Sequence, residues 1–193
     1  MSRSLCRYPV TLWEDLSSVV RCCPSNPPAP VMRIFIRMKN EELQISATNC
    51  LDVGSSTWGF TQVLLEHWAV HVDAVDVGTD QLDPILKHDE RVSSYEQTDI
   101  RSFRSKKSYD HIVCDASFIS LQEILPTILN LANIRTKIIL LWKPQFEVGK
   151  ENLRKTWVPK NEEIILLKQG EWEEFLKKHN CKILQKMKST VIG

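Results

Sequence analysis

From residue 47 onward, short apolar runs alternate with segments of helical periodicity, and this alternation constrains the fold more than any other feature. Strands that alternate with helices form βαβ units with right-handed crossovers around a parallel sheet. We therefore predict an α/β fold with a doubly wound, mostly parallel sheet. The predicted strands are residues 49–53, 70–77, 92–95, 110–115, 137–142 and 182–187, and the predicted helices are 60–67, 81–87, 120–132 and 161–179.

Residues 1–45 lack this alternation. The prolines between residues 24 and 30 indicate an extended linker, because proline ends helices and cannot donate to a strand ladder. Residues 5–20 are compatible with a short helix, and residues 34–38 form a brief apolar run. We predict an irregular N-terminal segment (1–45) with a proline-rich linker, followed by one domain (46–193).

Composition excludes several classes of protein. With 193 residues, 42% hydrophobic and 25% charged, the chain matches an ordinary globular domain and not a disordered one. Its net charge of +1 means that any basic surface for nucleic acid must be local. Apolar runs are too short to span a membrane, so we expect a cytoplasmic protein with no membrane partner. The six cysteines lack metal-ligand spacing, and we predict buried free thiols and no metal site.

In parallel α/β sheets, ligands bind at the carboxyl ends of the strands. The turn after the first predicted strand departs from the dinucleotide fingerprint, because Ser56 replaces its second glycine. The spacing of Gly54 and Gly59 matches a phosphate-binding loop, but Phe60 replaces the lysine that would neutralise phosphates. An acid that closes the second strand, Asp76, suits ribose hydroxyls. Together these features predict an adenosine ligand without phosphates, most commonly S-adenosylmethionine (SAM).

Motifs at the strand ends carry a family resemblance. The chain resembles the hemolysin A-type (TlyA-like) branch of the FtsJ-like ribosomal RNA methyltransferases, in order from about residue 50 to residue 193. This resemblance implies the Rossmann-like fold of SAM-dependent methyltransferases, ribose 2′-O-methylation, and ribosomal RNA or a ribosomal subunit as the partner. The segments that carry it are CLDVGSSTWGFT (50–61), AVDVG (74–78), DASFISL (115–121) and KPQFE (143–147).

The same resemblance implies roles for the residues at the strand ends. Asp76 would bind the ribose of SAM, Asp99 would lie near the adenine, and Asp115 would sit beside the transferred methyl group. Asp115 and Lys143 match the middle pair of the family's catalytic Lys-Asp-Lys-Glu set, in which a lysine can take the hydroxyl proton. The residues implied to hold the methionine part of SAM are Gly54, Ser55, Ser56, Gly59 and Phe60.

The family pattern breaks at both ends. Arg37 stands where the first catalytic lysine is expected, and arginine does not readily lose a proton. The chain ends at Gly193, before the family's Gly-Asn-x-Glu segment. We therefore expect a fold truncated before its last strand, which leaves neighbouring backbone groups unpaired or re-paired. An alternative thus stays open: a catalytically impaired or fragmentary relative that keeps the fold and weak SAM or RNA binding.

Glycine and tryptophan each occur six times, which is few glycines for this length. The resemblance places glycine at Trp58, and also at Trp68 and Trp157. We hypothesise that these are glycine codons translated as tryptophan, for instance UGA in an organism that reads it as glycine. Taken as written, Trp58 would fill the space needed by the carboxypropyl group of SAM.

Overall fold

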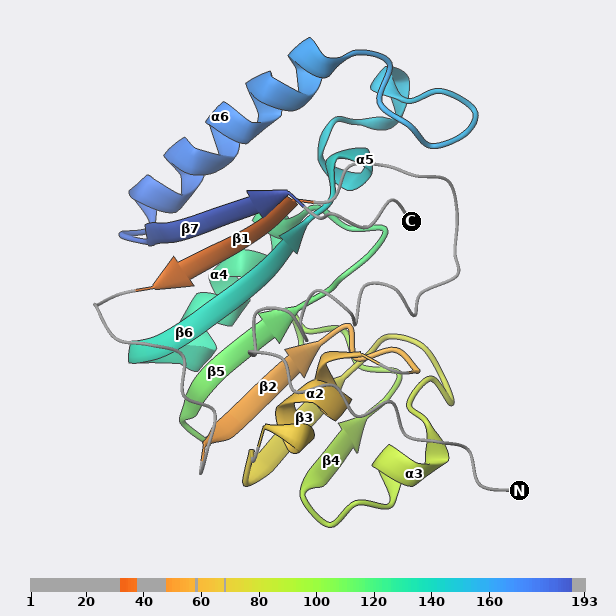
Figure 1. Ribbon diagram of the computed structural model, residues 1–193, viewed down its shortest axis with the longest axis vertical. Coiled ribbons are helices and arrows are strands. Elements are labelled where there is room, and N and C mark those ends of the chain that lie inside the picture. The colour runs from red at the N-terminus through yellow and green to blue at the C-terminus, as the bar shows by residue number, and fades with distance from the viewer. Residues whose placement is uncertain (1–31, 38–47, 58, 68, 189–193) are drawn as a thin grey trace.

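The computed structural model describes residues 32–37, 48–57, 59–67 and 69–188, with the backbone alone for 32–37, 187 and 188. Within this part of the chain, seven strands form one sheet in the order β4-β3-β2-β5-β6-β1-β7 (Figure 1). The strands are β1 (Met32–Arg37), β2 (Asn49–Val53), β3 (His71–Val75), β4 (Val92–Tyr95), β5 (Tyr109–Cys114), β6 (Ala132–Trp142) and β7 (Lys182–Lys188).

The strands β4, β3, β2, β5 and β6 run parallel to one another. From β2 the chain first builds outward through β3 and β4, and then continues on the other side through β5 and β6. The strand order therefore reverses between β2 and β5, where ligands bind in sheets of this kind. The predicted doubly wound, mostly parallel sheet is confirmed.

One strand of the sheet comes from the segment that we predicted to be irregular. Strand β1 lies antiparallel between β6 and β7, with Met32 opposite Trp142 and Arg37 opposite Lys137. We expected the strand at this place to be missing and its neighbours to be unpaired or re-paired; they are re-paired, with β1. The predictions for residues 1–31, including the helix at 5–20 and the proline-rich linker, lie outside the described residues, as do Trp58 and Trp68.

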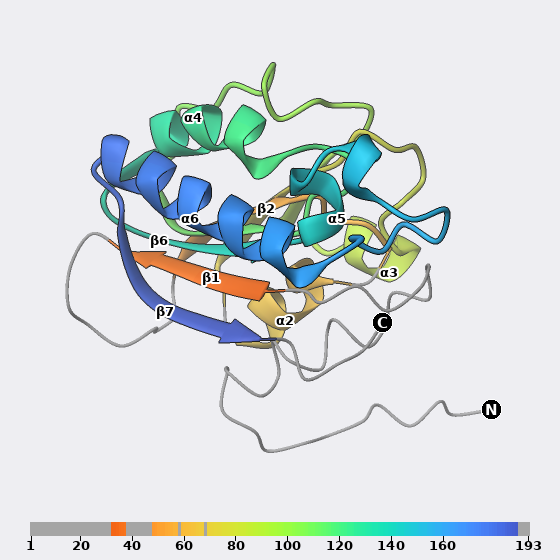
Figure 2. The ribbon, with the colours of Figure 1, turned by 90° about the horizontal axis from the view of Figure 1, so that it is seen from above.

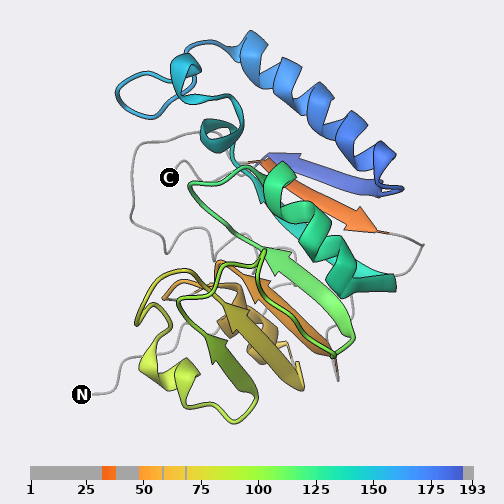
Figure 3. The same cartoon turned by 180° about the vertical axis from the view of Figure 1, so that it is seen from behind.

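Helices cover both faces of the sheet. Figure 2 shows α4 and α6 on one side and α2 on the other, and Figure 3 shows α4 in front of the sheet when the molecule is seen from behind. The side chain of Ser120 caps the first turn of α4, and that of Asn161 caps α6. The helices are α2 (Phe60–Glu66), α3 (Pro84–Lys87), α4 (Leu121–Leu131), α5 (Pro144–Glu147) and α6 (Glu162–Lys178), with a 3₁₀ turn at Lys150–Asn152.

Two hydrophobic clusters lie on the two faces of the sheet, because successive side chains of a strand point to opposite sides. In β5, Ile112 and Cys114 pack under α4 and α6, whereas Val113 packs against α2. Trp142 at the end of β6 and Trp172 of α6 are fully buried in the first cluster. This packing holds the carboxyl ends of the strands in fixed positions.

Two expectations from composition can be compared with the structure. Cys50, Cys114 and Cys181 are free and buried, as predicted for the first two from their apolar surroundings. The remaining cysteines lie outside the described residues. No helix in the described part of the chain is long and apolar enough to cross a bilayer.

Candidate active site

The turn after β2 lies between the ends of its two neighbouring strands. The N–H of Gly54 donates to the carbonyl of Val75 at the end of β3, at 2.8 Å. On the other side, the N–H of Asp115 donates to the carbonyl of Val53 at 2.9 Å. The residues predicted to act together are thus brought to one edge of the sheet, as the carboxyl ends of parallel strands require.

Gly54 makes this close approach possible. Its φ is +78°, a conformation that glycine adopts without strain. A Cβ at this position would lie 3.0 Å from the carbonyl oxygen of Asp115 and 3.1 Å from the nitrogen of Ala116. Any side chain here would push away the segment that carries Asp115, so glycine is needed to hold the two segments together.

Asp76 is anchored by backbone donors from two turns. Its Oδ2 accepts from the N–H of Ser56 at 2.9 Å, and its Oδ1 accepts from the N–H of Gly78 at 2.8 Å. A carboxylate oxygen can accept more than one hydrogen bond, and this carboxylate is partly exposed. Asp76 is therefore oriented and still able to accept hydrogen bonds from a pair of hydroxyl groups.

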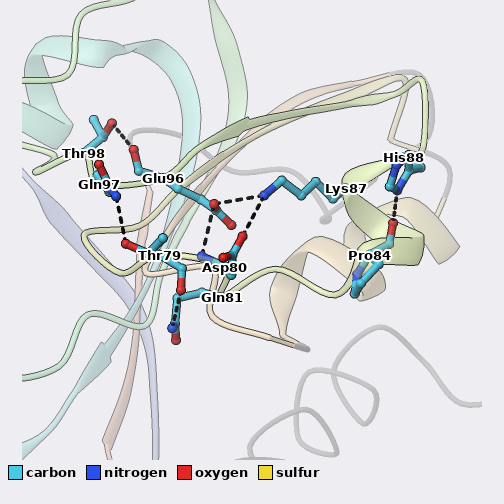
Figure 4. Close-up of polar contacts among 9 residues, drawn as sticks. All are labelled: Thr79, Asp80, Gln81, Pro84, Lys87, His88, Glu96, Gln97 and Thr98. Carbon is cyan, nitrogen blue, oxygen red and sulfur yellow. Dashed lines mark hydrogen bonds and ion pairs between the residues drawn. The ribbon is translucent and has the colours of Figure 1, made fainter.

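The turns beyond Asp76 are tied to each other by polar side chains (Figure 4). Lys87 donates to Glu96 at 3.0 Å and to Asp80 at 3.5 Å, and so joins the turn after β3 to the turn after β4. The amide of Gln97 donates to the hydroxyl of Thr79 at 3.0 Å. These contacts are exposed and individually weak. Together they hold the two turns side by side as one wall of the site.

The ends of β5 and β6 carry an ion pair. Nζ of Lys143 lies 2.5 Å from Oδ1 of Asp115 and donates to Oγ of Ser117 at 2.8 Å. The Lys143 side chain is 14% exposed and that of Asp115 is 22% exposed, so the pair is mostly buried and still partly accessible to a ligand. Burial raises the pKa of the Asp115 carboxyl, and the adjacent Lys143 opposes this rise. A lysine held by a carboxylate at a strand end is an arrangement that can orient a hydroxyl group and receive its proton.

The model of the FtsJ-like methyltransferase family matches residues 35–189. The chain belongs to the FtsJ-like methyltransferase family. It is 43% identical over 168 residues to the 23S rRNA (cytidine-2′-O)-methyltransferase TlyA of Campylobacter jejuni, covering 84% of this chain and 66% of that protein. It is 44% identical over 111 residues to the 16S/23S rRNA (cytidine-2′-O)-methyltransferase TlyA of Mycobacterium tuberculosis, covering 56% of this chain and 41% of that protein.

A solved structure agrees with this assignment. The crystal structure of a candidate hemolysin from Lactococcus lactis has a TM-score of 0.66 and 34% identity, covering 70% of this chain and 67% of that one. The predicted resemblance to the TlyA-like branch is confirmed. The chain spans 66% and 41% of the lengths of the two TlyA relatives.

Two residues of the predicted cofactor site already have contacts within the protein. The side chain of Phe60 is buried in the core under α2, so only its backbone can face the turn. The carboxylate of Asp99 pairs with Arg101, with Oδ2 2.6 Å from a guanidinium nitrogen. The hydrogen bond from Arg101 lowers the pKa of Asp99. A ligand bound by Asp99 would have to share this carboxylate with Arg101.

The structure places Arg37 far from the predicted catalytic pair. Arg37 is opposite Lys137 in β6, six positions before Lys143. At about 3.3 Å per residue, its backbone lies roughly 20 Å from that of Lys143. Arg37, which aligns with the family's first lysine in the sequence, therefore lies out of reach of the pair, because an arginine side chain does not span that distance.

Sequence analysis gave no role to three polar residues near the site. Asp52 is fully buried beneath the Gly54 turn and accepts from the hydroxyl of Thr61 at 2.6 Å; burial raises its pKa to about 7. Ser117 binds Lys143, and Glu147 binds the start of α4. All three lie within the motifs that carry the family resemblance, and this position in the sequence could have marked them as site residues.

An exposed aromatic group borders the ion pair. Phe118 is 80% exposed, and its ring centroid lies 5.1 Å from that of Phe146 and 6.2 Å from that of Trp157. Exposed rings of this kind offer a flat face to a nucleic-acid base. The site therefore combines an anchored carboxylate, a lysine–carboxylate pair and an aromatic surface.

Proposed function

We propose that this chain is a SAM-dependent methyltransferase that methylates a ribose 2′-hydroxyl of ribosomal RNA. The observation that carries the proposal is the Asp115–Lys143 pair, held directly against the Gly54 turn in a member of the FtsJ-like family. The relatives named as ribosomal RNA (cytidine-2′-O)-methyltransferases support the choice of substrate class. We propose a cytoplasmic location on the same ground.

The residues present fit SAM in two respects. The absence of a side chain at Gly54 keeps the turn narrow, and the anchored Asp76 can accept the hydrogen bonds of the ribose. SAM supplies a methyl group carried on a positively charged sulfur. We propose that it is held by Asp76 at the ribose, Asp99 at the adenine, Asp115 near the methyl group, and the turn residues Gly54, Ser55, Ser56, Gly59 and Phe60.

The chemistry of the protein's own residues follows from the ion pair. A ribose hydroxyl is a poor nucleophile, so it must be positioned in line with the methyl group and must lose its proton. Nζ of Lys143, kept at a fixed place by Asp115 and Ser117, orients the hydroxyl group, and the Asp115–Lys143 pair accepts its proton as the methyl group is transferred. The low exposure of both side chains limits the access of water to this proton transfer.

The position of Arg37 supports a second candidate function. The described residues bring together Asp115 and Lys143, and Arg37 lies at the opposite end of β6. A chain without the family's first lysine beside this pair would be a weaker enzyme, because each positioned acid–base group contributes about 100-fold or more. The alternative is therefore an impaired relative that binds SAM and RNA.

Two measurements test the proposal. Calorimetric titration with SAM measures cofactor binding, and transfer of labelled methyl to ribosomal subunits, followed by nucleoside mass spectrometry, identifies any 2′-O-methylated product. We expect Lys143→Ala to reduce transfer about 100-fold or more while SAM binding is retained. Asp76→Asn should instead weaken SAM binding.

The exposed Lys106→Ala variant is the matched control and should leave both quantities unchanged. Binding without transfer by the wild-type chain would favour the impaired relative. Absence of both would contradict the two candidates together.

A further inference from the structure

The loop that joins β5 to α4 is held in a strained conformation. Phe118 in this loop has a φ of +64°, in the left-handed region that side chains rarely adopt, and its ring is 80% exposed. Such a conformation is strained and persists only where surrounding contacts hold it. Contacts with neighbouring residues must therefore fix the loop.

Glu147 fixes the far end of this loop. Its Oε2 accepts from the hydroxyl of Ser120 at 2.6 Å, and its Oε1 accepts from the N–H of Leu121 at 2.9 Å. Ser120 is the N-cap of the 11-residue helix α4, so the carboxylate also lies at the positive end of the helix dipole. Both oxygens of one carboxylate are therefore used to hold the start of α4.

The near end of the loop is fixed by the catalytic pair itself. Lys143 holds Ser117 by a 2.8 Å hydrogen bond, and Phe146 packs against Phe118. Lys143, Phe146 and Glu147 lie within five consecutive residues at the start and within the turn of α5. The segment after β6 thus contacts the loop after β5 at three successive places.

We propose that Glu147 is a positioning residue for methyl transfer. Its hydrogen bonds hold residues 115–121 against α5. This maintains the hydrogen bond between Ser117 and Lys143 and the position of the Phe118 ring near the Asp115–Lys143 pair. This inference rests on the proposed function, since it gives Glu147 a role in the reaction assigned to that pair.

The structure separates this role from general stability. The pairing of β5 with β6 places Asp115 and Lys143 at adjacent strand ends without help from Glu147. The Gly54 turn and Asp76 are held by β2 and β3. Loss of Glu147 should therefore release the loop and leave the cofactor-binding residues in place.

The test compares Glu147→Ala with Glu147→Gln, since glutamine keeps one acceptor for the N–H of Leu121. We expect Glu147→Ala to lower kcat for methyl transfer about 10- to 100-fold, the scale of a small misplacement of reacting groups, with SAM affinity unchanged within about twofold. Glu147→Gln should recover most of the lost rate. Glu174→Ala, an exposed glutamate of α6, is the control and should match the wild type.

A second readout does not depend on activity. Hydrogen–deuterium exchange of the amides of residues 116–121 should be faster in Glu147→Ala than in the wild type and in Glu174→Ala. Unchanged exchange, or SAM affinity that falls in parallel with the rate, overturns the proposal. If the wild-type chain transfers no methyl, the proposed function fails, and the exchange comparison still decides whether Glu147 holds the loop.

Discussion

At the scale of single residues, Trp157 is the position at which sequence and backbone conflict. Its φ is +60°, and it closes a tight turn in which its N–H donates to the carbonyl of Arg154 at 2.9 Å. The bridge between Leu153 and Pro159 makes this turn the tip of a small hairpin. Hairpin turns of this length favour glycine at the left-handed position. The left-handed conformation supports the hypothesis that the codon for position 157 encodes glycine.

Replacing Trp157 tests this strain directly. We expect Trp157→Gly to be more stable than Trp157→Ala by about 1 kcal/mol, because both variants lack the ring and only alanine keeps a Cβ in the left-handed conformation. Urea denaturation of the two variants measures the difference. Equal free energies of unfolding would show that the turn is not strained and would remove this support for a glycine at position 157.

At the scale of elements, β1 lies between β6 and β7 and pairs with both of them. It bonds to β6 in continuous register and to β7 with a shift between Phe35 and Ile36. A strand between two neighbours uses its backbone groups on both sides, whereas the outermost strands β4 and β7 each have one neighbour in the described sheet. The strand therefore connects β7 and α6 to the parallel part of the fold.

Amide exchange and a proline substitution test this arrangement. The amides of residues 33–36 should exchange more slowly than those of the edge strand β4, since both sides of β1 are paired. Ile34→Pro should lower the free energy of unfolding by about 1–3 kcal/mol, because proline removes a donor from an interior strand and leaves its acceptor in the neighbouring strand unpaired. Exchange of these amides at the rate of exposed loops would show that β1 does not occupy this place in solution.

At the scale of the whole molecule, burial shifts the pKa values of titratable groups in opposite directions. Burial raises the pKa of Asp52 to about 7 and lowers that of His111 to about 4. Among the described residues, neither ring nitrogen of His111 has a hydrogen-bond partner. Asp52 holds its proton more tightly in the folded chain, so it costs stability as pH rises from about 4 to 7. His111 binds its proton more tightly in the unfolded chain, so it costs stability as pH falls from about 6.5 to 4.

Asp52→Asn isolates the first of these effects, because asparagine can still accept from Thr61 and does not ionise. We expect the variant to gain about 2 kcal/mol relative to the wild type between pH 5 and pH 8. Chemical denaturation at several pH values measures this gain, and the exposed Glu174→Gln variant should show no such trend. A constant difference across this pH range would show that Asp52 is ionised at pH 5.

The sequence by itself determined the parallel core of this fold and much of its site. The apolar runs and helical periodicities that predict β2 to β6 are local signals, and parallel strands bring their carboxyl ends to one edge. The convergence of Gly54, Asp76, Asp115 and Lys143 follows from that topology together with the family motifs. These elements need no knowledge of distant contacts.

Only the tertiary structure decided the remaining features. The place of β1 depends on pairing with β6 and β7, which lie about 100 or more residues later, and no local pattern encodes such pairing. The same applies to Arg37, which aligns with the family's first lysine in the sequence and which strand pairing places at the opposite end of β6 from Lys143. Glu147 acts on α4 across 26 residues of sequence, through contacts that exist only once both segments are packed.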